Sequence, residues 1–403
     1  MELAYGVIRH LLTLDHILSF YIKESGQGVT PAIRDVLRLA VYQMGYLDKI
    51  PERAAVNEAV EAAKKSGGRG AAGFVNAVLR SYLRNPGKVR YPDPKAAPYS
   101  CLSLEYSYPE WLAKRWVGRV GFDEASALMA AGNATPPLTL RVNTLKTDRD
   151  TLVRLLGEAG IGCSPTTYAP YGVTLETGSP VTELPGYKEG LFAVQDEAAQ
   201  LVPLLLSPKA GDRILDACAA PGGKSAHIAA LAGGEVKVVA MDIGLDKTRV
   251  LTENIRRLGA SNVMPFIADA GAPLPFKDHF DSTLLDAPCS ALGVIRRRPE
   301  IKYARLEKDI KRLAALQARM LRNLALAIRP GGVLVYSVCS TEPEEGELQV
   351  EGFLKEDVGF VLEDARAFLP LGAGELVTEG GYMRTWPHLQ GTDGFFAARL
   401  RKK

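Results

Sequence analysis

The chain has 403 residues, of which 47% are hydrophobic and 24% are charged. This length suits two or three domains, and the composition is that of a folded, soluble protein rather than a disordered one. No apolar run approaches the roughly 18 residues of a membrane span, and the first residues lack an export signal, so we expect a cytoplasmic protein that does not bind membranes.

The cysteines argue against two classes of protein. There are five of them, an odd number, and none has CxxC spacing, which disfavours both a disulfide framework and a zinc cluster. We therefore expect free thiols in a reducing compartment and no bound metal. The net charge is only +3, but residues 1–100 carry 14 Lys and Arg against 9 Asp and Glu, as expected for a part that contacts phosphates.

The first part of the chain is predicted to be an all-α domain over residues 1–90. Apolar residues recur at helical spacing over residues 3–22, 31–47, 54–63 and 71–83. Between residues 53 and 90 there are eight Lys and Arg against two Glu. This excess fits either a solvated helical face or a surface that docks on nucleic acid, and we favour the second interpretation.

Residues 91–190 are expected to hold a linker and a small α+β domain. Pro92, Pro94 and Pro98 mark the linker. A helical pattern over residues 108–130 is then followed by a strand, a helix and further strand-like pieces. These elements are predicted at residues 138–144, at 150–159 and up to 190.

Residues 191–403 are expected to form an α/β domain with a doubly wound, Rossmann-like parallel sheet, because strands and helices alternate. The strands are predicted at residues 213–217, 236–241, 263–268, 281–285 and 333–337, with closing strands near 382–385 and 394–400. The helices are predicted at residues 223–232, 246–258 and 307–328.

Four of the predicted strands end in an aspartate, namely Asp216, Asp242, Asp269 and Asp286. A glycine-containing loop follows the first of them and opens a helix, whose free N–H groups suit a carboxylate or phosphate. The spacing of its glycines is neither GxGxxG nor GxxxxGK[ST], which disfavours a dinucleotide or a nucleoside triphosphate as the ligand. Asp242 is placed to accept ribose hydroxyls and Asp269 to meet an adenine amino group. One such aspartate is more often a helix cap, but four together favour S-adenosyl-L-methionine as the cofactor.

Two cysteines are predicted to lie at the same edge of the sheet. Cys289 follows Asp286 by three residues, and Cys339 ends a later strand. A single cysteine is more often a small buried hydrophobe, but a pair at one ligand-binding edge favours nucleophilic catalysis. A thiolate that adds to C6 of cytosine would make C5 able to attack a sulfonium methyl group.

RNA contacts are expected from two basic segments. Arg296, Arg297 and Arg298 directly follow the Cys289 loop, and we favour phosphate contacts over a solvated loop for them. Arg141 and Asn143, on the predicted strand at residues 138–144, are candidates to contact the same RNA.

Three motifs resemble those of the Sun family of RNA cytosine-5 methyltransferases. They are Asp-Ala-Cys-Ala-Ala-Pro-Gly-Gly-Lys (216–224), Asp-Ala-Pro-Cys-Ser (286–290) and Tyr-Ser-Val-Cys-Ser (336–340). Residues 54–60 and 73–80 are similar to a NusB-like RNA-binding domain, and residues 293–302 to the family's bacterial 16S rRNA members. The resemblance implies a class I methyltransferase domain that uses S-adenosyl-L-methionine and acts on 16S rRNA. We expect a monomer.

The resemblance also implies the role of each site residue. Cys339 would add to C6 of cytosine, Cys289 would assist breakdown of the adduct, and Asp286 would hydrogen-bond the base. Lys224 would lie near the methionine end of the cofactor and near the base, with Asp242 at the ribose and Asp269 at the adenine. The residues expected to bind the cofactor are Asp216, Cys218, Ala219, Ala220, Pro221, Gly222, Gly223, Lys224, Asp242, Lys247, Arg249, Asp269 and Asp286.

Three other functions stay open from the sequence. The same catalytic edge would serve a tRNA or a DNA cytosine methyltransferase, and the chain could be an RNA-binding ribosome assembly factor without catalysis. The chain departs from the family at Val338, where Thr is usual before the nucleophile. Family members also carry more residues before the match at Glu2, so we expect a short or trimmed front domain.

Overall fold

The computed structural model describes residues 2–22, 29–176 and 180–403. It divides into two compact units. Unit 1 comprises Met1–Ala134 and Ile295–Ala304, and unit 2 comprises Thr135–Val294 and Arg305–Lys403. A short segment of the chain's second half therefore belongs to the first unit.

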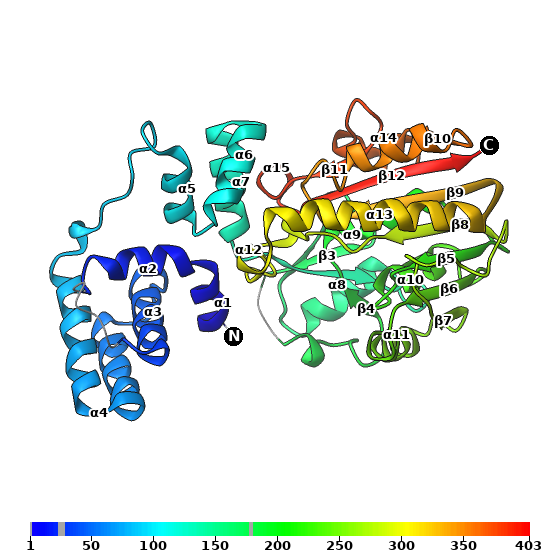
Figure 1. Ribbon diagram of the computed structural model, residues 1–403. Helices are drawn as coiled ribbons and strands as arrows, with labels where there is room; N and C mark the ends of the chain where they lie inside the picture. Colours follow the sequence, from blue (N-terminus) through cyan, green and yellow to red (C-terminus); the bar gives the residue numbers. More distant parts are fainter. Residues whose placement is uncertain (1, 23–28, 177–179) are drawn as a thin grey trace. The chain divides into compact units, whose positions relative to one another are not determined.

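Helices are the only regular secondary structure among the described residues of unit 1 (Figure 1), which confirms the prediction of a helical front. Its α-helices are α1 (Glu2–Arg9), α2 (Leu11–Ser19), α3 (Pro31–Tyr46), α4 (Glu52–Arg84), α5 (Pro98–Tyr106), α6 (Glu110–Val120), α7 (Phe122–Asn133) and α12 (Ile301–Ala304). The α3 helix begins where Pro31 occupies its first turn and the Thr30 side chain accepts a hydrogen bond from Ile33 N. Fully buried Leu14, Leu37 and Leu79 form part of the core shared by α2, α3 and α4.

Two helix boundaries differ from those predicted. The helices predicted at residues 54–63 and 71–83 are the two parts of α4, which meet at a kink where Gly68 has a non-helical backbone (φ 76°, ψ −167°). The single pattern predicted over residues 108–130 is two helices, because Gly121 at φ 85° separates α6 from α7. In both cases a glycine adopts a backbone conformation that other residues avoid.

Unit 2 begins with a small α+β part, as predicted. The helix α8 (Arg149–Glu158) accompanies a four-stranded antiparallel sheet of order β2-β3-β1-β4. These strands are β1 (Leu138–Val142), β2 (Cys163–Pro165), β3 (Gly172–Leu175) and β4 (Phe192–Val194). Leu140 and Val142 of β1 pack with Leu152 and Leu156 of α8 in a common core.

The larger sheet carries the candidate site. Its order is β10-β12-β9-β8-β5-β6-β7, with β11 beside β12. Its strands are β5 (Arg213–Ala217), β6 (Lys237–Asp242), β7 (Val263–Ile267), β8 (Phe280–Asp286), β9 (Ile328–Val338), β10 (Phe360–Glu363), β11 (Met383–Thr385) and β12 (Phe395–Lys402). The five strands from β9 to β7 are parallel, as predicted, whereas β12 runs antiparallel to β9, so that the whole sheet is mixed.

Helices cover both faces of this sheet (Figure 1). They are α9 (Glu197–Leu201), α10 (Gly223–Leu231), α11 (Leu245–Leu258), α13 (Glu307–Ala327), α14 (Glu347–Glu356) and α15 (Pro387–Gln390). Successive residues of a strand face opposite sides: Leu284 packs in the core that includes α10 and α11, and Leu285 in the core that includes α13 and α14. With both faces filled, the carboxyl ends of the parallel strands are the edge where ligands bind.

Candidate active site

The predicted aspartates lie at the carboxyl edge of the parallel strands. Asp286 ends β8, Asp242 ends β6, and Asp216 is the penultimate residue of β5. Asp269 lies two residues beyond β7, where its Oδ1 accepts a hydrogen bond from Gly271 N at 2.7 Å. The edge therefore collects several carboxylates from separate strands.

The loop after β5 is built around Asp216. Ser225, in the first turn of α10, donates to Asp216 Oδ2 at 2.6 Å, while Asp216 Oδ1 is buried and has no partner among the described residues. Burial raises the pKa of Asp216 to about 7. Gly222 precedes α10 at φ 98°, and a Cβ there would lie 2.8 Å from the Leu251 side chain, so that only glycine fits this turn.

A second carboxylate anchors the same loop from β6. Asp242 Oδ2 accepts from Ala220 N at 2.9 Å, and its Oδ1 accepts from Ile243 N at 2.7 Å and from Lys247 Nζ at 3.1 Å. Lys247 therefore reaches this carboxylate, whereas Arg249 pairs with Asp246 at 3.6 Å on the exposed side of α11.

Lys224 and Asp286 form an ion pair at the centre of the edge. Lys224 Nζ lies 2.6 Å from Asp286 Oδ2, and Ser337 Oγ donates to Asp286 Oδ1 at 2.7 Å. Burial opposes the charge of Lys224, but Asp286 outweighs it and raises the pKa of the ammonium. Lys224 is also 5.4 Å from the centroid of the Phe395 ring.

The two predicted thiols lie side by side, with Cys289 Sγ and Cys339 Sγ 3.4 Å apart. They follow the adjacent parallel strands β8 and β9, where Asp286 is paired with Ser337. The hydrogen bond to Cys339, together with burial, raises the pKa of Cys289 well above its usual value. Burial raises the pKa of Cys218 to about 12, which makes this thiol a poor nucleophile.

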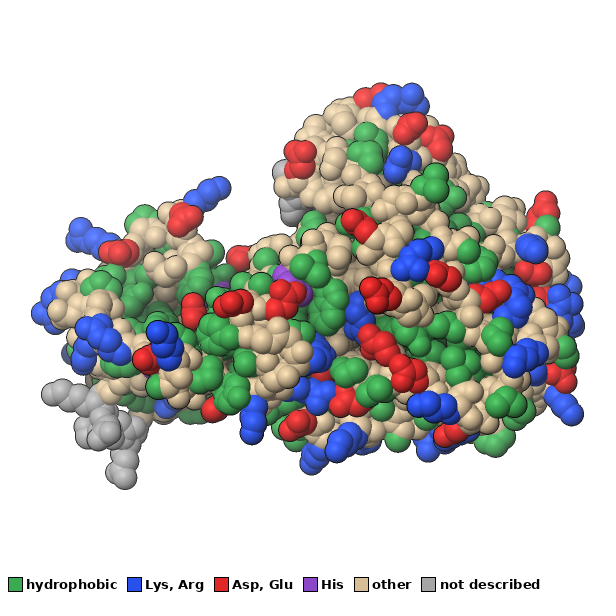
Figure 2. All heavy atoms as spheres, turned by 90° about the horizontal axis from the view of Figure 1, so that it is seen from above, with side chains coloured by type: hydrophobic (Ala, Val, Ile, Leu, Met, Phe, Trp, Pro, Cys, Tyr) green, Lys and Arg blue, Asp and Glu red, His purple; other side chains and the backbone are tan. Residues whose placement is uncertain are grey.

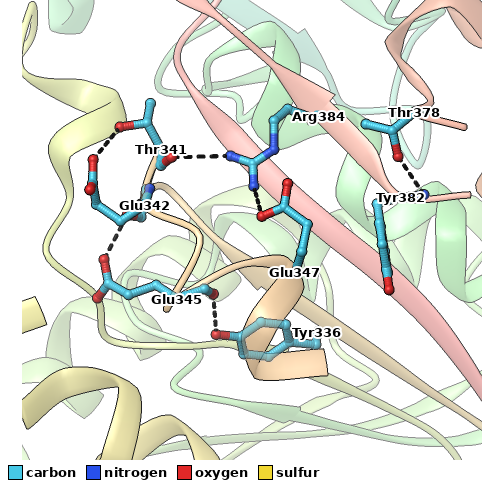
Figure 3. A network of polar contacts seen from close by, with 9 residues as sticks. Tyr336, Thr341, Glu342, Glu345, Glu347, Thr378, Tyr382 and Arg384 are labelled. Carbon is cyan, nitrogen blue, oxygen red and sulfur yellow. Dashed lines mark hydrogen bonds and ion pairs between the residues drawn. The ribbon is translucent and has the colours of Figure 1, made fainter. Parts of the chain in front are cut away.

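A buried polar cluster behind the cysteines was not predicted from the sequence. Glu345 is fully buried and accepts hydrogen bonds from the Ser290 and Ser340 hydroxyls at 2.5 and 2.6 Å. Figure 3 shows its backbone carbonyl facing the Tyr336 hydroxyl, which donates to it at 2.6 Å. The only sequence signal was four glutamates within residues 342–347, a pattern typical of an exposed acidic loop.

The residues predicted to contact RNA are mostly not exposed. Asn143 is buried and donates to the carbonyl oxygens of Gly190 and Leu258 at 2.8 and 2.7 Å, which gives it a structural role. Arg141 is 1% exposed, and burial lowers its pKa to about 9. Arg296 is buried within unit 1, Arg297 is half-buried, and Arg298 is exposed beside Glu300.

The basic residues of α4 and the segment after it are exposed. All eight Lys and Arg between residues 53 and 90 have exposed side chains, and Figure 2 shows Lys and Arg projecting from this unit on one face. Within the described parts of the chain, no group of three His, Cys, Asp or Glu could hold a metal. No helix among the residues described is long and apolar enough to cross a membrane.

Comparison with protein-family models gives three matches. A model described as 16S rRNA methyltransferase RsmB/F matches residues 203–401. The NusB family model matches residues 1–84, and a ferredoxin-like domain of RsmF/B-like methyltransferases matches residues 108–182.

Similar proteins cover the whole chain. A probable ribosomal RNA small subunit methyltransferase B of Bacillus subtilis is 39% identical over 405 residues, which span 100% of this chain and 90% of that protein. The ribosomal RNA small subunit methyltransferase B of Escherichia coli O127:H6 is 36% identical, with the same two coverages.

Solved structures agree with these relatives. The crystal structure of PH0851 has a TM-score of 0.81 at 26% identity and covers 99% of this chain and 89% of its own. The structure of NSun6 from Pyrococcus horikoshii with SFG has a TM-score of 0.65 at 26% identity and covers 73% of this chain and 98% of its own. The chain is thus a member of the 16S rRNA methyltransferase RsmB/F family.

Proposed function

We propose that this protein transfers a methyl group from S-adenosyl-L-methionine to C5 of a cytosine in 16S rRNA, with Cys339 as the nucleophile. The observation that carries the proposal is the pair of thiols 3.4 Å apart at the same sheet edge as the Lys224–Asp286 ion pair. An aromatic carbon that is not acidic needs covalent activation before it can be alkylated, and a thiol at this edge can supply it.

The residues around the β5 loop fit the cofactor. The unpartnered Asp216 Oδ1 is a buried acceptor suited to an ammonium group. Asp242 has acceptor sites left beyond its three hydrogen bonds, and with Asp269 it would hold the ribose and adenine. When bound, the cofactor supplies an electrophilic methyl group on a sulfonium.

The positions of the side chains support the following chemical steps. The Cys339 thiolate forms a bond to C6 of a cytosine flipped out of its stack, and the electron pair displaced from the C5–C6 bond makes C5 nucleophilic. Asp286, held by Lys224 and Ser337, hydrogen-bonds the base. After methylation C5 loses its proton, the electron pair of that bond reforms the C5–C6 double bond, and Cys339 leaves with its bonding pair. Cys289, beside this sulfur, assists the release.

The test compares methyl transfer by the wild type and two cysteine variants. Purified protein with labelled cofactor should methylate 16S rRNA in preference to tRNA or duplex DNA. Cys339→Ala should abolish transfer, whereas Cys289→Ala should accumulate protein covalently bound to RNA. Loss of turnover in Cys289→Ala without any trapped RNA would contradict the roles given to the two thiols.

We also propose that the NusB-like front binds the rRNA. Its eight exposed Lys and Arg between residues 53 and 90 suit phosphate contacts, which carry affinity and make it depend on salt. Replacing Lys64, Lys65 and Arg69 by Gln should raise the KM for rRNA and leave kcat unchanged. It should also reduce the dependence of binding on salt, measured by fluorescence anisotropy at several concentrations. Equal salt dependence of binding in wild type and variant would show that these three residues do not contact the RNA phosphates.

A further inference from the structure

The buried carboxylate of Glu345 joins the two loops that carry the cysteines. Ser290 follows Cys289 and gives Glu345 two hydrogen bonds, from its backbone N at 2.8 Å and its hydroxyl at 2.5 Å. Ser340 follows Cys339 and gives a third, from its hydroxyl at 2.6 Å. One side chain therefore fixes the position of both loops.

Further hydrogen bonds reach both the carboxylate and the backbone of Glu345. Gln317 of α13 donates to Glu345 Oε1 at 3.1 Å and to the carbonyl oxygen of Pro288 at 3.0 Å. The Tyr336 hydroxyl holds the Glu345 backbone, and Figure 3 shows the side chain extending away from that contact. Burial raises the pKa of Glu345, and the hydrogen bonds from Ser290, Ser340 and Gln317 oppose that shift by stabilising the charged carboxylate.

The two sulfurs consequently lie in different electrostatic environments. The charge of Glu345 opposes a thiolate at Cys289. Lys224, by contrast, interacts favourably with negative charge on Cys339. Each sulfur also faces the other at 3.4 Å, so that only one of them can readily carry the negative charge.

We propose that Glu345 is a positioning residue for the two cysteines: its carboxylate holds their loops together and disfavours negative charge on Cys289, so that the attack on cytosine falls to Cys339. The inference deepens the proposed function and rests on it for the identity of the reaction. It differs from a purely structural role because it concerns which of two adjacent thiols reacts.

The test replaces Glu345 by Gln, which has nearly the same size but no charge. The matched control is Glu351→Gln, an exposed carboxylate on α14. Iodoacetamide labelling without RNA, followed by peptide mass spectrometry, gives the alkylation rates of Cys289 and Cys339. We expect E345Q to increase the rate at Cys289 relative to Cys339 by about tenfold, the effect of one pKa unit, and the control to leave the ratio unchanged. An unchanged ratio in folded E345Q overturns the proposal.

A second readout uses rRNA that contains 5-fluorocytosine, which cannot lose its C5 substituent and so retains the attacking thiol. Wild type should carry the RNA on Cys339, and E345Q should carry part of it on Cys289, with kcat lowered and the KM for rRNA unchanged. RNA solely on Cys339 at wild-type kcat overturns the proposal. If the wild type traps no RNA and transfers no methyl, the proposed function fails, while the alkylation ratio still decides the role of Glu345.

Ser340→Ala keeps the test informative if E345Q does not fold. It removes one hydrogen bond to Glu345 and leaves the charge in place. Because the charge of Glu345 stays while the loop of Cys339 is no longer held, we expect Cys339 to be labelled faster relative to Cys289 than in the wild type, by about two- to tenfold, the scale of one hydrogen bond. A labelling ratio equal to that of the wild type counts against positioning by Glu345.

Discussion

At the scale of single residues, the Lys224–Asp286 ion pair at the sheet edge should contribute to both stability and activity. Lys224→Met leaves Asp286, 30% exposed, without its cation, so we expect the free energy of unfolding to fall by about 1 to 3 kcal/mol and methyl transfer to be lost. The double variant Lys224→Met/Asp286→Leu should recover part of that stability, since no unpaired charge remains. Urea denaturation measures both, and a double variant less stable than Lys224→Met would contradict this account.

The buried Asp216 predicts a pH dependence of stability. Its pKa is raised from 3.8 to about 7 in the folded protein. Between these values the unfolded state loses the proton while the folded state keeps it, so stability falls as pH rises through this window and does not recover above it. Asp216→Asn lacks this loss, and its stability relative to wild type should therefore increase from pH 4 to pH 8 in urea denaturation. A constant difference would contradict the burial of an ionisable Asp216.

The sequence predicted the aspartates and cysteines of the site, but not the residues that position them through hydrogen bonds. Aspartates at strand ends and cysteines three residues or fewer beyond them were found because strand ends are visible in the apolar pattern. Val338, at the position where the sequence resemblance predicts Thr, is fully buried in an apolar core, and the neighbouring Ser337 donates its hydroxyl hydrogen bond to Asp286. Glu345 could not be predicted, since its hydrogen-bond partner Gln317 lies on α13, which is remote in sequence.

At the level of elements, the helix α4 makes a specific prediction about glycine. Gly68 adopts φ 76°, ψ −167°, and no atom lies within 4 Å of a Cβ placed there. Gly68→Ala should therefore lower the free energy of unfolding by about 1 to 3 kcal/mol through backbone strain alone. Gly73→Ala, in the same helix and equally open, should raise it by about 0.5 to 1 kcal/mol. Thermal unfolding compares the two, and effects of the same sign would contradict the break at Gly68.

Strands were predicted more closely than helix ends. The predicted strand at residues 213–217 matches β5 at both ends, because a buried parallel strand is a short apolar run with clear limits. The helix breaks at Gly68 and Gly121 lie inside or between periodic patterns, and the period alone does not report where the backbone changes direction.

At the scale of the whole molecule, unit 1 is built from two separate segments of the chain, which the order of the sequence does not predict. Ile295–Ala304 belongs to this unit although its neighbours in the chain belong to unit 2. Within unit 1, Lys302 Nζ is buried, which lowers its pKa, and it donates to Arg9 O at 3.0 Å, Ser107 O at 3.2 Å and Asn133 Oδ1 at 2.5 Å. No local pattern in residues 295–304 indicates these distant partners.

Lys302→Met should make the segment Ile295–Ala304 more accessible to proteases. Arg9 O and Asn133 Oδ1 would lose this donor, while Ser107 O keeps a hydrogen bond from the Tyr303 hydroxyl; a buried group left unsatisfied costs about 1 to 3 kcal/mol. We expect trypsin to cleave after Arg296 and Arg297 faster than in the wild type, which mass spectrometry of the fragments measures. Lys308→Met, at an exposed position of α13, is the control. Equal cleavage of Lys302→Met and the control would show that Lys302 does not hold the segment.

The central claim is that the protein methylates a cytosine of 16S rRNA at C5, and bisulfite sequencing of that rRNA from cells with and without the gene tests it most directly. We predict one cytosine that resists conversion in the parent and converts in the deletion strain. Resistance should return with a plasmid-borne wild type but not with Cys339→Ala. An identical set of resistant cytosines in parent and deletion strains would contradict the claim.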